Sequence, residues 1–177
     1  MALNYKNVPS LFTWGGLGDI SEGRANLGDD MPVLVYRLFQ YSMKDILKRE
    51  YGAETAAELY RAAGYLAGTQ FAHNVLDLSG DFDYFVTNLQ KQLTELKIGI
   101  LRIEKADIAN STFTLTVSED LDCSGLPVTD ETVCDYDEGF LAGILEAYTG
   151  KPFAVKEIDC WASGDRTCRF TAKGATA

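Results

Sequence analysis

Four cysteines are the residues of this sequence best suited to hold a metal ion. The chain of 177 residues contains no others, and all four lie in its last third. Their sulfur atoms would come from a loop, from the start of a helix and from the two sides of a hairpin, and four thiolates suit tetrahedral zinc. An iron–sulfur cluster can use the same ligands, and free cysteines can also be no more than small buried side chains. The four residues are Cys123, Cys134, Cys160 and Cys168.

No other motif in the sequence predicts catalysis. The lone His73 has no identifiable partner for acid–base chemistry. The N-terminal glycines lack the spacing of a nucleotide-binding loop, and no hydrolase or metalloprotease motif occurs. Asp120 and Asp122 are expected to be solvated loop charges rather than metal ligands. We therefore predict no catalytic residue, and the lack of a dinucleotide fingerprint favours a protein that is not an enzyme.

The elements that must position the cysteines follow from the hydrophobic periodicity. Apolar residues at three- and four-residue spacing predict helices over residues 31–51, 54–74, 82–96 and 135–149. Alternating β-branched residues predict strands over residues 98–104, 111–118, 153–161 and 166–172, the last two joined by a tight hairpin turn. Helices followed by a ββαββ segment predict an α+β fold, in which the N-terminal helices pack on an antiparallel sheet.

Glycine has two expected roles in the first half of the chain. The first 30 residues are glycine-rich and are expected to form an extended arm or a short hairpin, so we divide the chain into an arm, 1–26, and a domain, 27–177. Gly64 and Gly68 share one face of the second helix, where each costs about 1 kcal/mol relative to alanine. Close helix packing is the expected compensation, and close approach of a ligand is the alternative.

Composition limits the partners. The chain carries 16 basic and 26 acidic residues, a net charge of −10, and no basic patch is evident. Such a surface repels nucleic acids and anionic lipids. No apolar stretch reaches the roughly 20 residues of a membrane span, and no signal peptide is visible. We expect a cytoplasmic protein, in which the cysteines are free thiols or metal ligands.

The segment from Val133 to Phe170 resembles the 4-vinyl reductase domain family. The resemblance rests on a cysteine before a glycine-containing helix, then Glu-x-x-Cys, then Gly-Asp-x-x-Cys-x-Phe. It covers about residues 27–172, most strongly the last forty of them. It implies an α+β fold with an enclosed hydrophobic pocket, as in sensory domains of aromatic-responsive bacterial activators. The matching residues here are Cys134, Gly139, Gly143, Glu157 to Cys160, and Gly164 to Phe170.

The resemblance also implies a zinc site made by three cysteines and one carboxylate. The three cysteines correspond to Cys134, Cys160 and Cys168, and Glu119 is the nearest match to the acidic ligand. Because Cys123 lies in the same stretch, we expect it to be the fourth ligand, with Glu119 as the alternative. Four protein ligands close the metal shell, so the site would be structural and would pin the hairpin to the helix that walls the pocket.

These observations predict a small-molecule-binding or sensor domain with structural zinc. Its ligand would be apolar, such as a hydrocarbon, an aromatic or a tetrapyrrole-like compound. The alternative is a 4-vinyl reductase, or an accessory factor, in (bacterio)chlorophyll-type tetrapyrrole metabolism. We also expect a homodimer, formed through the exposed face of the first helix and the arm. The aromatic side chains expected to contact the ligand are Tyr36, Phe39, Tyr65, Phe71, Phe85 and Phe140.

Overall fold

A computed structural model describes residues 10–175 of the chain. The chain divides into two compact units, Met1–Met31 and Pro32–Ala177. In the first unit, the expected extended arm or hairpin is wrong, because two short helical turns form instead: η2 (Trp14–Leu17) and α1 (Ile20–Gly23). The side chains of Thr13 and Asp19 accept backbone N–H groups at the two starts, and such caps favour helical turns.

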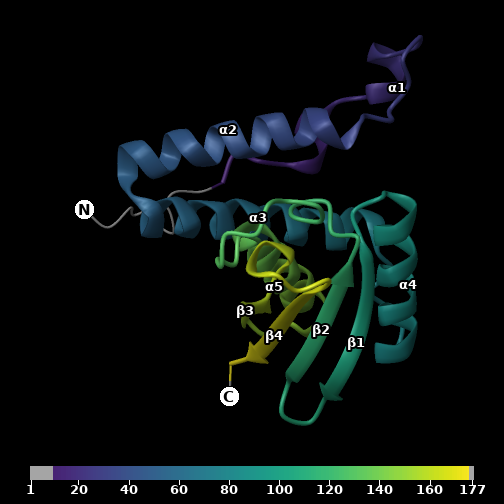
Figure 1. The fold of residues 1–177 in the computed structure, drawn as a ribbon. Helices are drawn as coiled ribbons and strands as arrows, with labels where there is room; N and C mark the ends of the chain where they lie inside the picture. The colour runs from purple at the N-terminus through teal and green to yellow at the C-terminus, as the bar shows by residue number, and fades with distance from the viewer. Residues whose placement is uncertain (1–9, 176–177) are drawn as a thin grey trace. The chain divides into compact units, whose positions relative to one another are not determined.

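The second unit contains four longer helices and one sheet (Figure 1). The helices are α2 (Val33–Tyr51), α3 (Ala53–Val75), α4 (Phe82–Glu95) and α5 (Asp135–Thr149). The strands are β1 (Ile100–Asp107), β2 (Thr112–Ser118), β3 (Phe153–Asp159) and β4 (Cys168–Gly174). They pair antiparallel in the order β1-β2-β4-β3. The expected α+β fold is therefore confirmed.

The core lies between the sheet and three of the helices. Alternate residues of β2 and β4 are buried, among them Leu115 and Phe170, as a sheet with one covered face requires. Helix α4 contacts β1, and α5 contacts β3 (Figure 1). Helix α4 buries Phe85, Leu89 and Leu93, which recur every fourth residue and so form one apolar stripe.

Glycines allow α3 and α5 to pack closely. A Cβ atom on Gly64 or Gly68 would overlap a backbone carbonyl oxygen of α5. A Cβ atom on Gly139 or Gly143 would in turn overlap a carbonyl oxygen of α3. The interpretation of the α3 glycines as helix-packing residues is thus confirmed, and α5 supplies a matching pair.

The connection between β3 and β4 differs from the tight turn that the sequence predicts. A 3₁₀-helix, η3 (Trp161–Ser163), follows β3, and β4 begins at Cys168 rather than at Arg166. The Ser163 hydroxyl accepts the Cys160 N–H at 3.0 Å, and the Cys160 carbonyl accepts the Ser163 hydroxyl at 2.9 Å. This closed turn fixes the backbone on which Cys160 lies.

Candidate metal and ligand site

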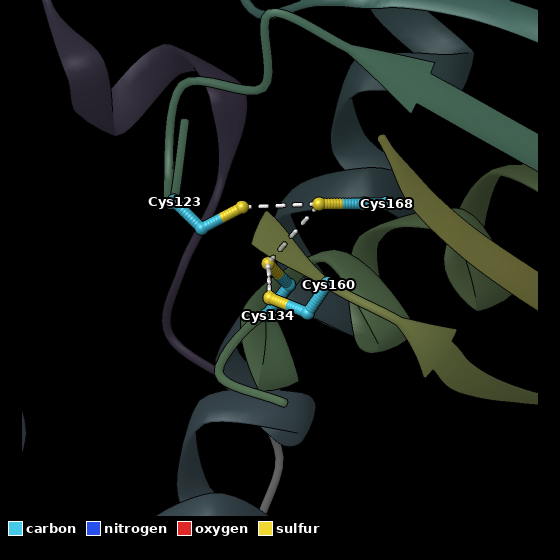
Figure 2. A group of neighbouring side chains, drawn as sticks. All are labelled: Cys123, Cys134, Cys160 and Cys168. Atoms are coloured by element: carbon cyan, nitrogen blue, oxygen red, sulfur yellow. Dashed lines mark hydrogen bonds between the residues drawn. The ribbon is translucent and has the colours of Figure 1, made fainter. Parts of the chain in front are cut away.

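The structure brings the four cysteine sulfurs together (Figure 2). All lie within 4.8 Å of one another, and all four residues are buried. Cys134 Sγ lies 3.9 Å from the sulfurs of both Cys160 and Cys168, and Cys123 Sγ lies 3.0 Å from that of Cys168. Tetrahedral Zn–S bonds of about 2.3 Å place sulfurs about 3.8 Å apart, whereas a disulfide needs about 2.05 Å. The cluster can therefore hold a metal ion, and the thiols are free.

Each sulfur comes from a different local structure. Cys123 lies in the loop after β2, Cys134 is the residue immediately before α5, Cys160 follows β3, and Cys168 begins β4. Glu119, the alternative fourth ligand, is exposed and lies outside the cluster, with a φ of 53°. The fourth member of the group is Cys123.

The thiols perturb one another because no bond separates their charges. Hydrogen bonding with the Cys123 sulfur is the largest cause of each shift: it lowers the pKa of Cys160 and raises the pKa values of Cys134 and Cys168. One thiolate in such a cluster is stabilised by the protons of the others. A bound cation would instead favour four thiolates, since metal ligands bind in the deprotonated form.

Buried carboxyl groups surround the sulfur cluster. The expectation that Asp120 and Asp122 are solvated is wrong, because they are only 4% and 3% exposed. Asp120 accepts the backbone N–H of Cys123 at 3.0 Å, and Glu157 accepts that of Cys134 at 3.0 Å. Burial raises the pKa of Asp120 to about 7 and that of Glu157 to about 8. The positions of both aspartates beside Cys123 were the available sequence signal.

Asp137 completes a second group of candidate ligands. A carboxylate oxygen of Asp120, another of Asp137 and the Cys134 sulfur all lie within 4.8 Å of one another. Oδ2 of Asp137 is buried and has no hydrogen-bond partner among the described residues. Burial raises the pKa of Asp137 well above its usual range. The surroundings of the cysteines are therefore rich in groups that a cation or a hydrogen-bond donor would stabilise.

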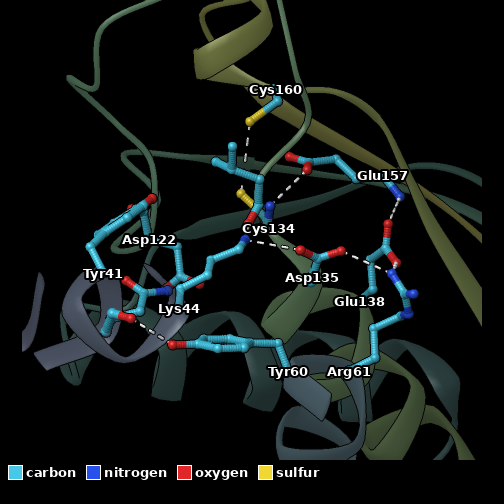
Figure 3. Close-up of polar contacts among 12 residues, drawn as sticks. Tyr41, Lys44, Tyr60, Arg61, Asp122, Cys134, Asp135, Glu138, Glu157 and Cys160 are labelled. Atoms are coloured by element: carbon cyan, nitrogen blue, oxygen red, sulfur yellow. Dashed lines mark hydrogen bonds and ion pairs between the residues drawn. The ribbon is translucent and has the colours of Figure 1, made fainter. Parts of the chain in front are cut away.

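Helix α2 contacts the cysteine-bearing segments through polar side chains (Figure 3). Lys44 Nζ donates to the Val133 carbonyl at 2.6 Å and pairs with Asp135 at 2.9 Å, on either side of Cys134. On the loop that carries Cys123, the Tyr41 hydroxyl donates to the Asp122 carbonyl at 2.9 Å. Sequence analysis missed this function of α2, because Lys44 resembles any other helix-surface lysine.

Further ion pairs connect α3, α5 and β3 behind Cys134. Arg61 pairs with Asp135 at 2.9 Å and with the buried Glu138 at 3.4 Å. Glu138 also pairs with Lys156 at 2.7 Å and accepts the N–H of Glu157 at 2.9 Å. Since Glu157 in turn holds the Cys134 amide, the position of this cysteine depends on three elements (Figure 3).

Three of the six predicted ligand-contacting aromatics lie in the core. Phe71 and Phe140 are in contact, with ring centroids 5.3 Å apart. Phe85 stacks on Tyr148 instead, with centroids 4.0 Å apart. All three of the predicted residues are buried. Their main role is therefore packing.

The other three lie apart from this group. The Tyr36 hydroxyl donates to Asp122 Oδ1 at 2.7 Å, and burial raises the pKa of this tyrosine. Tyr65 is partly buried on α3, and Phe39 is 67% exposed on α2. The six residues thus do not line one cavity.

A small internal space does lie between the helices and the sheet. Its volume is about 20 Å³, enough for about one water molecule. Of the six predicted aromatics, Phe140 alone contributes to its walls. The other lining residues are Leu93, Ile98, Val117, Asp120, Asp137 and Leu141.

Residues 113–173 match the family model of the 4-vinyl reductase domain. This segment, from β2 to β4, contains all four cysteines, and the match confirms the resemblance to that family. Two uncharacterized proteins of Methanocaldococcus jannaschii are similar in sequence. One is 27% identical over 69% of this chain and 69% of its own length. The other is 26% identical over 83% of this chain and 80% of its own length.

Three solved structures share the fold. A vinyl-4-reductase family protein from M. jannaschii has a TM-score of 0.63 and 21% identity, covering 95% of this chain and 100% of that one. The phenol-responsive sensory domain of the transcription activator PoxR, solved with phenol, has a TM-score of 0.67 and 17% identity, covering 89% and 90%. A trafficking protein particle complex subunit 3 from Naegleria fowleri, covalently bound to palmitic acid, has a TM-score of 0.64 and 11% identity, covering 81% and 95%.

No helix within residues 10–175 combines the length and the apolar character needed to cross a membrane.

Proposed function

We propose that this protein is a ligand-binding domain for a small apolar molecule that carries one hydrogen-bond donor. The observation that supports this most directly is the internal space beside α5. Apolar side chains of three elements form most of its lining, and the unpartnered carboxyl group of Asp137 belongs to it. Binding sites of this kind combine an apolar lining with a few polar groups that orient the ligand.

The proposal requires side chains to move when the ligand enters. A space of about 20 Å³ is too small for an aromatic ring. Leu93 and Ile98 lie near the end of α4 and in the link to β1, so they can move without breaking the sheet. The PoxR and trafficking-complex proteins, which share this fold, were solved with phenol and with palmitic acid, and this supports an apolar ligand.

Thermal unfolding and calorimetry with phenol and with toluene test the proposal. Both compounds should raise the unfolding temperature, and phenol should bind more tightly because its hydroxyl can donate to Asp137. Asp137→Ala should weaken phenol binding about fivefold, the worth of one hydrogen bond, and leave toluene binding unchanged.

Asp83→Ala is the matched control, because Asp83 is an exposed residue of α4 outside the cavity lining. It should bind phenol as the unaltered protein does. Failure of both compounds to bind, or equal phenol affinity in the Asp137 variant, would contradict the proposal.

The proposal includes a zinc ion held by Cys123, Cys134, Cys160 and Cys168. Thiolates are preferred zinc ligands, and the observed sulfur separations are compatible with a tetrahedral site. Four protein ligands leave no open position for substrate, so the metal would stabilise the fold rather than take part in a reaction. An iron–sulfur cluster would use the same residues and would be recognised by its absorption spectrum.

The proposal also includes a homodimer formed through the outer face of α2. This face is apolar along the length of the helix, and Leu34, Leu38 and Phe39 are each more than 60% exposed there. A second copy presents the same face, and two-fold symmetric dimers are built from such self-complementary surfaces.

A further inference from the structure

A second and larger hollow lies on the surface next to the cysteine cluster. It is a groove of about 470 Å³, lined by parts of α2, the loop after β2 and the turn between β3 and β4. Ser124 and Trp161, which follow Cys123 and Cys160 directly in the chain, form part of its wall. The groove shares only Asp120 with the internal space of the proposed function, so it is a separate candidate site.

Basic side chains are concentrated in this groove. Arg37, Lys97 and Arg166 line it, together with the acidic Glu119 and Asp120. Asp120 is buried and already accepts two backbone N–H groups, at 2.8 and 3.0 Å. Basic residues thus outnumber acidic ones here, although the whole chain has 16 basic and 26 acidic residues. An anion would find a favourable position in an otherwise repulsive protein.

Neutral carbonyl groups hold Arg37 in place. Its Nε donates to the Leu121 carbonyl at 2.9 Å, and its Nη2 donates to the Ser124 carbonyl at 2.9 Å. Within residues 10–175, no carboxylate forms an ion pair with Arg37 or with Arg166. Carbonyl oxygens orient a guanidinium without neutralising it, so Arg37 keeps its charge for a ligand.

An aromatic platform supports the second arginine. The guanidinium of Arg166 lies 5.3 Å from the ring centroid of Trp161. The indole is itself fixed, because its Nε1 donates to the Leu126 carbonyl at 3.1 Å. Val33 and Leu121 add apolar surface to the same groove. Planar cationic and apolar groups therefore occur side by side.

We infer that this groove binds a small aromatic carboxylate. Arginine matches the two oxygens of a carboxylate with two parallel hydrogen bonds. The apolar part of the ligand would lie against Trp161, Val33 and Leu121. Inorganic phosphate offers the charge without the flat apolar group, and a neutral aromatic alcohol offers the reverse, so neither should bind as tightly.

Isothermal titration with benzoate tests the inference, with acetate, inorganic phosphate and benzyl alcohol as comparison ligands. Benzoate should bind most tightly, and its affinity should fall as salt is added. Arg166→Gln should weaken benzoate binding about tenfold, since a charge-assisted hydrogen bond is lost. Arg166→Lys should lie between the two, because it keeps the charge but loses the fork of donors.

Arg102→Gln is the matched control. It removes the same charge from an exposed position on β1 outside the groove, and it should leave benzoate affinity unchanged. Asp137→Ala should also leave it unchanged, which separates this site from the internal one. Absence of benzoate binding, equal binding by Arg166→Gln, or tighter binding of phosphate than of benzoate would overturn the inference.

Discussion

Helices α2 and α4 both contain apolar and polar faces, yet they use them in opposite ways. Helix α4 buries its apolar stripe, including Phe85 and Leu89, against the core. In α2 the buried residues are Gln40 and Lys44, while Leu38 and Phe39 are exposed. The periodicity of a sequence shows that a helix has two faces, but the surroundings decide which face meets the protein.

The difference follows from what each helix packs against. Helix α4 lies against the apolar face of β1, which offers no hydrogen-bonding groups to it. Helix α2 lies against loops that carry Cys123 and Cys134, where the carbonyls of Asp122 and Val133 need donors. Buried polar groups have to be paired, so the loops select the polar face of α2.

Loss of the metal site should have the largest effect and should act mainly on α2. Cys160→Ser should abolish zinc binding and lower the free energy of unfolding by more than about 5 kcal/mol, because a structural zinc site adds its binding energy to folding. Amide hydrogen exchange should become faster in α2, whose contacts run to the cysteine loops, and should change less in α4. Metal analysis by mass spectrometry gives the zinc content.

Ser124→Ala is the control for that experiment, since it alters the neighbour of Cys123 without removing a sulfur. It should retain one zinc ion per chain. Retention of zinc by Cys160→Ser, or equal changes of exchange in α2 and α4, would count against a zinc site on which α2 depends.

The same truncation should have different costs in the two helices. Leu89→Ala in α4 should lower the free energy of unfolding by about 2–5 kcal/mol, because it leaves a cavity in the core. Leu38→Ala in α2 should change the stability of the monomer by no more than about 0.5 kcal/mol, because this side chain is 64% exposed. Urea unfolding at low protein concentration measures both. Similar costs would mean that α2 packs as α4 does.

The smallest effect on folding should accompany the loss of self-association. Phe39→Ser should shift the sedimentation mass from that of a dimer towards the 19.5 kDa of one chain. Its free energy of unfolding as a monomer should stay within about 0.5 kcal/mol of the original. Lys48→Ser, an exposed change on the same helix, should remain dimeric. A monomeric original protein would show that this apolar face does not mediate self-association.

Much of the fold could be predicted because local patterns and long-range packing agree. The helix of residues 135–149 has the predicted bounds, since Gly150 takes a left-handed conformation directly after it. Gly64 and Gly68 indicated close packing before any partner was known, because two glycines in one helix need compensation. The first 30 residues were predicted wrongly, because the local caps of Thr13 and Asp19 outweighed the extended conformation expected of a glycine-rich segment.

The candidate site was predictable only in part. The four cysteines could be identified from residue type and family resemblance, because few other residues can bind a metal in their place. The burial of Asp120 and Asp122 could not, since carboxyl groups in a loop are usually solvated. It depends on α2, a segment more than 80 residues away along the chain, whose Tyr36 and Arg37 cover that loop.

The sequence by itself determined which segments are helices and strands, and which residues carry metal-binding sulfur. Both depend on residue type and on spacing along the chain. Only the tertiary structure decided that α2 presents Lys44 inward, that Phe85 and Phe140 serve the core, and that Arg37 and Arg166 share a groove. These features arise from contacts between distant segments, where desolvation of each group is balanced by partners that local sequence does not specify.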